Sequence, residues 1–191
     1  KYYIYILNNK ISLDFMLLSS KKINTKFETV AFKLLDVSEK LISLNDISKR
    51  NGIVLAFICN HCPYVKDIIS RMVNDFNILQ SLDVGVAAIM PNDTEQYPKD
   101  SYEKMKEFSL NNKFSFPYLY DKDQSVANAY QAVCTPDFFG FNKNNKLFYR
   151  GRLDNLKFQE NNKNREPSLI NAFKQMLKNN SIVENQISSI G

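Results

Sequence analysis

The strongest constraint on the fold is a change of hydrophobic period on either side of Pro63. The run "GIVLAFI" (52–58) is continuously apolar, which is typical of a strand buried on both faces, as in a parallel sheet. After Pro63, apolar residues recur at helical spacing from Val65 to Leu79. Proline is tolerated in the first turn of a helix because an N–H there would have no partner within the helix. The sequence therefore predicts a buried strand that leads directly into a helix.

The rest of the chain alternates between the same two patterns. We expect further strands at 26–37, 40–47 (a short hairpin partner entering a turn), 84–91, 116–120, 134–142 and 146–153. We expect helices at 101–111, 124–131 and 167–180. The last two strands are joined by "NKNN", which reads as a hairpin turn. This order predicts an α/β fold in which a mixed central sheet carries helices on both faces and is extended by an N-terminal β-hairpin.

Length and charge exclude several classes of protein. The chain has 191 residues, which suits one domain, and we assign residues 26–191 to it and residues 1–25 to a poorly ordered tail. The net charge of +5 is scattered among acids, so we expect no nucleic-acid partner. No run reaches the ~18 apolar residues of a membrane span, and we expect no membrane partner. Without a convincing signal peptide the default location is the cytoplasm, and secreted, periplasmic and organellar locations stay open.

Two of the three cysteines and the only histidine fall within "CNHCP". A close CxxC pair with one distant cysteine fits redox or metal chemistry better than a disulfide scaffold. Because a thiolate at a helix N-terminus is stabilised, we expect Cys59 to have a lowered pKa. The end of the strand should keep Cys59 near the surface, where it would act as the nucleophile. Cys62, turned inward, would resolve the mixed disulfide. His61 would either stabilise the Cys59 thiolate or merely point to solvent.

A second signal is Thr135-Pro136 at the start of a predicted strand. A proline opening a strand after a small polar residue is a setting in which a cis bond is tolerated. Cys134 directly precedes this pair, so it would lie close to the other two cysteines if the loop faces them. It would then act either as an extra resolving thiol or, as we favour, as a small buried hydrophobe.

Five stretches together resemble one protein family: "FICNHCPYVK", "NDTEQYPKDS", "FPYLYD", "AVCTPDFFGF" and "YRGRLDN". The region from Val54 to about Asn155 resembles the thioredoxin superfamily, and within it the redoxin or AhpC/TSA-like branch with a CxxC motif. The resemblance implies a thioredoxin-like fold with Pro136 in cis, its loop facing the two cysteines and the backbone of Thr135 pairing with a substrate strand. It also implies a thiol–disulfide oxidoreductase that acts on protein or small-molecule thiols and disulfides, with no prosthetic group and no metal.

The chain departs from this family in three ways. Ile58 stands where thioredoxin itself has a tryptophan, and "GIVLAFI" lacks the buried acid of thioredoxin's central strand. Proton transfer from Cys62 would then use water or another group. Members of the branch continue beyond a stretch like "SSIG" (188–191) with one more cysteine, so we expect a further C-terminal element.

Two other functions compete with this interpretation. In a peroxiredoxin-like peroxidase, Cys62 would be the peroxidatic cysteine, since Cys62-Pro63 matches the end of the family pattern P-x-x-x-[TS]-x-x-C-P. Leu55 and Cys59 occupy the proline and threonine positions, so we expect any peroxidase activity to be weak. In a metal protein, the three cysteines and His61 would surround zinc or copper. Structural zinc sites use ligand pairs set farther apart, which disfavours that function.

Overall fold

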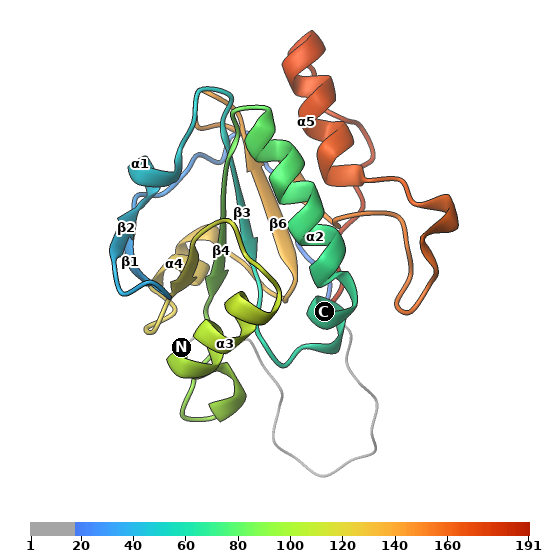
Figure 1. Ribbon diagram of the computed structural model, residues 1–191. Coiled ribbons are helices and arrows are strands. Elements are labelled where there is room, and N and C mark those ends of the chain that lie inside the picture. Colours follow the sequence, from blue (N-terminus) through green and yellow to red (C-terminus); the bar gives the residue numbers. More distant parts are fainter. Residues whose placement is uncertain (1–17) are drawn as a thin grey trace.

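The computed structural model describes residues 18–191, and a seven-stranded sheet organises them (Figure 1). The strands are β1 (Lys33–Asp36), β2 (Leu41–Ser43), β3 (Ile53–Phe57), β4 (Gly85–Met90), β5 (Tyr118–Tyr120), β6 (Asp137–Phe141) and β7 (Leu147–Gly151). Their order across the sheet is β2-β1-β5-β4-β3-β6-β7. The central β3, β4 and β5 run parallel, whereas β6, β7, β1 and β2 pair antiparallel. The mixed sheet and its N-terminal hairpin, β1–β2, are therefore confirmed.

Helices cover both faces of the sheet, as expected. They are α1 (Leu44–Ile47), α2 (Pro63–Ser81), α3 (Tyr102–Asn111), α4 (Ser125–Tyr130) and α5 (Ser168–Asn179), with short 3-10 turns η1 (Pro98–Asp100) and η2 (Asn162–Asn164). α2, α3 and α5 contribute to one apolar core, and α2 and α5 lie in front of the sheet in Figure 1. α1 and α4 contribute to the core on the opposite face. None of the helices within residues 18–191 combines the length and apolar character needed to span a bilayer.

The register of the central strands brings three loops to one edge of the sheet. Phe57, at the end of β3, pairs with Ile89 near the end of β4 and with Asp137 at the start of β6. Because β6 runs antiparallel to β3, its beginning lies beside the end of β3. The loops at 58–62, 91–101 and 131–136 therefore meet at this edge.

The first predicted strand is shorter than expected. The stretch 26–37 contributes only β1 and an isolated bridge between Glu28 and Lys146. The hairpin partner expected at 40–47 ends at Ser43, where the chain turns into α1. Ser43 and Asp46 form a capping box, with Ser43 N donating to Asp46 Oδ2 at 2.8 Å and Asp46 N donating to Ser43 Oγ at 3.3 Å. Such a box favours a helix start over continued strand.

A buried ion-pair cluster fastens the loop after β7 to α2. Asp154 accepts from Arg71 Nε at 2.9 Å and from Arg165 Nε at 2.7 Å. Arg165 also donates to Asp75, which lies in α2 and is 1% exposed. Burial raises the pKa of Asp75, and Arg165 opposes this effect. The long excursion at 152–166 is thus tied to the helix that begins at Cys62.

Of the stretch expected as a tail, residues 1–17 lie outside the described residues. Residues 18–20 run beside the last residues of the sequence, where Ser19 and Ile190 form an antiparallel bridge.

Candidate active site

The two cysteines of "CNHCP" sit at the junction of β3 and α2. Cys59 continues the buried course of β3, and the preceding Ile58 still hydrogen-bonds to Ile89 of β4. Cys62 is the N-cap residue of α2. Cys59 is 1% exposed and Cys62 is 8% exposed, and both are free thiols. The expectation that Cys59 lies near the surface and Cys62 is turned inward is therefore wrong.

The pKa values of the two cysteines also differ from the expectation. The pKa of Cys62 is lowered to about 6, first by a hydrogen bond from the Cys59 thiol and then by the backbone N–H groups of Val65 and Tyr64 at the start of α2. The pKa of Cys59 is raised, by its hydrogen bond to Cys62, by burial and by the negative charge of Asp100. The lowered pKa expected at Cys59 is thus found at Cys62, which accepts the hydrogen bond from the Cys59 thiol and lies at the start of α2.

The Thr135-Pro136 loop faces both sulfurs, and its peptide bond is cis, as expected. The Thr135 hydroxyl lies 3.2 Å from Cys59 Sγ, and the Thr135 carbonyl oxygen lies 3.2 Å from Cys62 Sγ. Cys134 is 2% exposed, and its thiol lies 3.6 Å from the Pro136 carbonyl oxygen. Burial raises the pKa of Cys134, which disfavours a reactive role for it.

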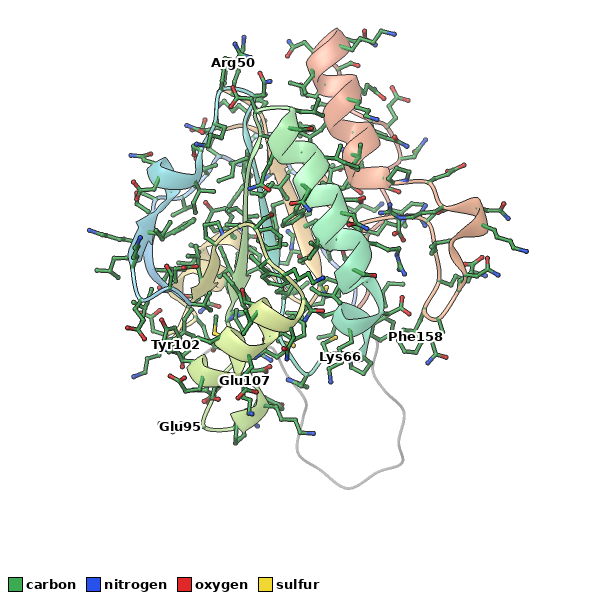
Figure 2. The ribbon with its side chains drawn as sticks, viewed as in Figure 1. Arg50, Lys66, Glu95, Tyr102, Glu107 and Phe158 are labelled. Atoms are coloured by element: carbon green, nitrogen blue, oxygen red, sulfur yellow. The ribbon has the colours of Figure 1, made fainter. Side chains whose placement is uncertain are left out.

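His61 is held by a buried carboxylate rather than pointing freely to solvent. Its Nδ1 lies 2.6 Å from Asp100 Oδ2, and its ring stacks on Tyr97 at a centroid distance of 5.2 Å. The hydrogen bond to Asp100 raises the pKa of His61, opposed by burial and by the positive charge of Lys66. Lys66 extends from the first turns of α2 (Figure 2).

Asp100 is the site residue that reasoning from the sequence missed. It is fully buried at the end of η1 and accepts hydrogen bonds from Asn60 N at 2.8 Å and His61 N at 3.2 Å. The Asn92 side-chain amide donates to the same carboxylate at 2.8 Å. The only sequence signal for it is its position in "NDTEQYPKDS", one of the five stretches that resemble the family. An acid from this loop thus lies beside the cysteines, although β3 carries none.

One group of side chains could hold a metal ion within residues 18–191. A sulfur of Cys59, a ring nitrogen of His61 and a carboxylate oxygen of Asp100 lie within 4.8 Å of one another. This set differs from the four expected ligands, because neither Cys62 nor Cys134 belongs to it. Asp100 Oδ2 already bonds to His61 and Asn92, so binding a metal would cost those hydrogen bonds.

Comparison with known proteins places this geometry in a family. The family model described as the AhpC/TSA family matches residues 25–150. The chain belongs to the AhpC/TSA family. The matched region contains both cysteines of the pair, His61, Asp100 and Cys134-Thr135-Pro136. No curated protein matches the chain.

Solved structures agree with this assignment. An uncharacterized conserved protein from Geobacillus kaustophilus shares 36% identity over 94% of this chain and 95% of its own, with a TM-score of 0.88. A hypothetical protein from Sinorhizobium meliloti 1021 shares 31% identity over 91% of this chain and 94% of its own, with a TM-score of 0.85. The thioredoxin domain of a thiol-disulfide oxidoreductase from Bacteroides vulgatus shares only 15% identity over 81% of this chain and 99% of its own, with a TM-score of 0.62. The AhpC/TSA protein therefore has the expected thioredoxin-like fold.

Proposed function

We propose that this protein is a thiol–disulfide oxidoreductase in which Cys62 and Cys59 cycle between a dithiol and a disulfide. The observation that carries the proposal is the paired environment of the sulfurs. Both are free thiols at the junction of β3 and α2, each sulfur lies 3.2 Å from Thr135, and the pKa is lowered at Cys62 and raised at Cys59. Membership of the AhpC/TSA family supports this function.

The geometry favours Cys62 as the attacking thiol. The Cys62 thiolate attacks one sulfur of a substrate disulfide R–S–S–R′, forming a Cys62–S–S–R mixed disulfide and releasing R′S⁻. Cys59 then loses its proton and attacks Cys62 Sγ, which releases RS⁻ and leaves a Cys59–Cys62 disulfide. The substrate is reduced by two electrons and the protein is oxidised by two. A protein dithiol or a small-molecule thiol would return the pair to the dithiol form.

This order reverses the roles expected from the sequence, where Cys59 attacks and Cys62 resolves. The reversal rests on two differences between the sulfurs. Cys62 is the more exposed residue, and its lowered pKa keeps it largely ionised at neutral pH. Cys59 is more deeply buried, and its raised pKa keeps it protonated until the second step.

His61 and Asp100 would assist that second step. Cys59 must develop negative charge in a buried place, which is costly without compensation. The imidazole of His61, fixed by Asp100, lies within 4.8 Å of the Cys59 sulfur. In its protonated form it would offset the new charge, and in its neutral form it would accept the proton. This pair would serve in place of the acid that β3 lacks.

Peroxide reduction by Cys62 is a second candidate, favoured by the lowered pKa of a cysteine directly before Pro63. The Cys62 thiolate would attack a peroxide ROOH, giving Cys62 sulfenic acid and an alcohol. Cys59 would then condense with the sulfenic acid, forming the same disulfide and releasing water.

Three variants test the proposal and separate its candidates. Cys62→Ser should abolish reduction of 2-hydroxyethyl disulfide, and Cys59→Ser should accumulate a mixed disulfide on Cys62 that mass spectrometry detects. Cys134→Ser, the matched control, should leave turnover unchanged. Trapping on Cys59 in Cys62→Ser would restore the roles expected from the sequence. Rapid peroxide consumption with no disulfide exchange would favour the peroxidase.

A further inference from the structure

The last residues of the sequence return to the active site and are anchored on the end of β7. Arg152 N donates to the Ile187 carbonyl at 3.0 Å, and Ser189 Oγ donates to the Gly151 carbonyl at 2.6 Å. Gly151 permits this approach, because a Cβ there would lie 2.3 Å from the Ile187 carbonyl oxygen. The segment 187–191 is therefore seated against the sheet.

A second segment pairs with it. Leu18 N donates to the Gly191 carbonyl and Gly191 N donates to the Leu18 carbonyl, both at 3.0 Å. Ser20 N donates to the Ser189 carbonyl at 2.9 Å, and Ser189 N donates to Ser20 Oγ at 2.9 Å. We call this two-stranded ribbon, residues 18–20 with 187–191, the strap.

The strap lies directly on the peptide of Thr135. A Cβ added at Gly191 would lie 2.1 Å from the Thr135 carbonyl oxygen and 3.0 Å from its nitrogen. That carbonyl oxygen is the one 3.2 Å from Cys62 Sγ. In Figure 1 the end of the chain accordingly lies by the start of α2. The strap therefore covers the backbone that a substrate strand would need for pairing.

A cavity lies beside the strap. A cavity of about 430 Å³ borders Pro136 and Tyr64 and is closed along one side by strap residues 187–190. Phe158 forms another part of its wall, with its ring 5.0 Å from that of Tyr64, and Figure 2 shows it beside the first turns of α2. This volume is in the range of small-molecule sites.

We propose that the strap selects low-molecular-weight disulfides over polypeptide disulfides. The inference rests on the proposed function and deepens it. A polypeptide substrate gains affinity by adding a strand to exposed main-chain groups, and at Thr135 the strap already occupies that place. A small disulfide needs no strand pairing and would approach Cys62 from the cavity, whose wall includes Tyr64 and Pro136 but neither sulfur. A polypeptide therefore binds only the fraction of molecules whose strap is displaced.

The test displaces the strap in the full chain without touching a cysteine. Gly191→Val puts a side chain into the Thr135 carbonyl, and Ser189→Ala removes the anchor on Gly151 without adding bulk. Ser38→Ala is the matched control, since this exposed residue lies in the turn between β1 and β2 and its side chain makes no hydrogen bond among the described contacts. Circular dichroism and thermal unfolding show that each variant is folded.

Two readouts are compared. Insulin reduction should rise by roughly tenfold in the two strap variants, while reduction of 2-hydroxyethyl disulfide changes little. Alkylation of Cys62 by a polyethylene-glycol maleimide should accelerate in the same variants, while alkylation by iodoacetamide does not. The inference would be overturned if the ratio of the alkylation rate with the maleimide to that with iodoacetamide were the same in the wild type, both strap variants and the control. Alkylation needs no turnover, so the comparison of alkylation rates tests the strap even if the protein exchanges no disulfide. A lack of disulfide exchange would instead refute the proposed function.

Discussion

Replacing Cys59 by Ala tests what sets the ionisation of Cys62. The hydrogen bond from the Cys59 thiol is the largest cause of the lowered Cys62 pKa, ahead of the N–H groups at the start of α2. Cys59→Ala removes this donor and should move the pKa upward from about 6. Cys59→Ser keeps a hydroxyl in the same place and should move it less. The helix N-terminus, which both variants retain, should keep it below 9.0.

The magnitudes decide which measurement is useful. At pH 7 a thiol with a pKa of about 6 is about 90% ionised, whereas one at the reference value is about 1% ionised. A lower pKa also makes each thiolate less nucleophilic, by roughly 20-fold over three units at a Brønsted coefficient of about 0.4–0.5. The two effects nearly cancel, leaving a rate advantage of roughly fivefold at pH 7. The midpoint of the pH profile is therefore the discriminating quantity.

The assay is alkylation by iodoacetamide between pH 5 and pH 10, in a Cys134→Ser background. The raised pKa of Cys59 keeps that thiol out of this range, so the inflection belongs to Cys62. An inflection near pH 9 with Cys59 present would refute the assignment of the ionised sulfur. An inflection that stays near pH 6 in Cys59→Ala would show that the helix start alone lowers the pKa.

Three further predictions concern stability. Arg165→Met leaves Asp75 buried without its main partner and should lower the free energy of unfolding by about 3 kcal/mol in urea titrations. Gly140→Ala would place a Cβ 2.9 Å from the Phe173 ring; we expect a loss of roughly 1–3 kcal/mol, partly recovered by adding Phe173→Leu. Asp100→Asn should cost more stability at pH 6 than at pH 9. The hydrogen bond to Asp100 raises the pKa of His61 in the folded protein above its unfolded value of about 6.5. The resulting stabilisation is fully present below pH 6.5 and is lost as the pH rises through the folded pKa of His61. Thermal unfolding at both pH values would measure the difference.

The fold could be predicted largely because its central elements are specified locally. A continuous apolar run, a proline and a helical period define β3 and α2 without knowledge of their neighbours. The N-terminal strands are harder to predict, because β1 pairs with β5, which lies more than 80 residues away in the chain. α1 was missed because the capping box at Ser43 competes with strand propensity over a few residues only.

Most residues of the site could also be predicted from the sequence. Which of the two cysteines has the lowered pKa could not. The resemblance to the thioredoxin superfamily implied that the Thr135-Pro136 loop faces Cys59 and Cys62, and in the structure Thr135 lies 3.2 Å from each sulfur. Which sulfur has the lowered pKa depends first on the direction of the hydrogen bond between the two thiols, which the spacing of the motif does not specify. The backbone N–H groups of Val65 and Tyr64 add to this effect at Cys62, the N-cap residue of α2.

Asp100 illustrates a second limit of the sequence. A carboxylate in a polar loop gives no sign of burial, because burial is imposed by the partners that fold over it. Here the backbone N–H groups of Asn60 and His61 and the amide of Asn92 together satisfy a fully buried charge. Those donors come from the ends of β3 and β4, and they meet only because the two strands pair in parallel. The acid missing from β3 is thus supplied through the sheet's topology, at the one edge where the cysteine loop and the loop after β4 are both held.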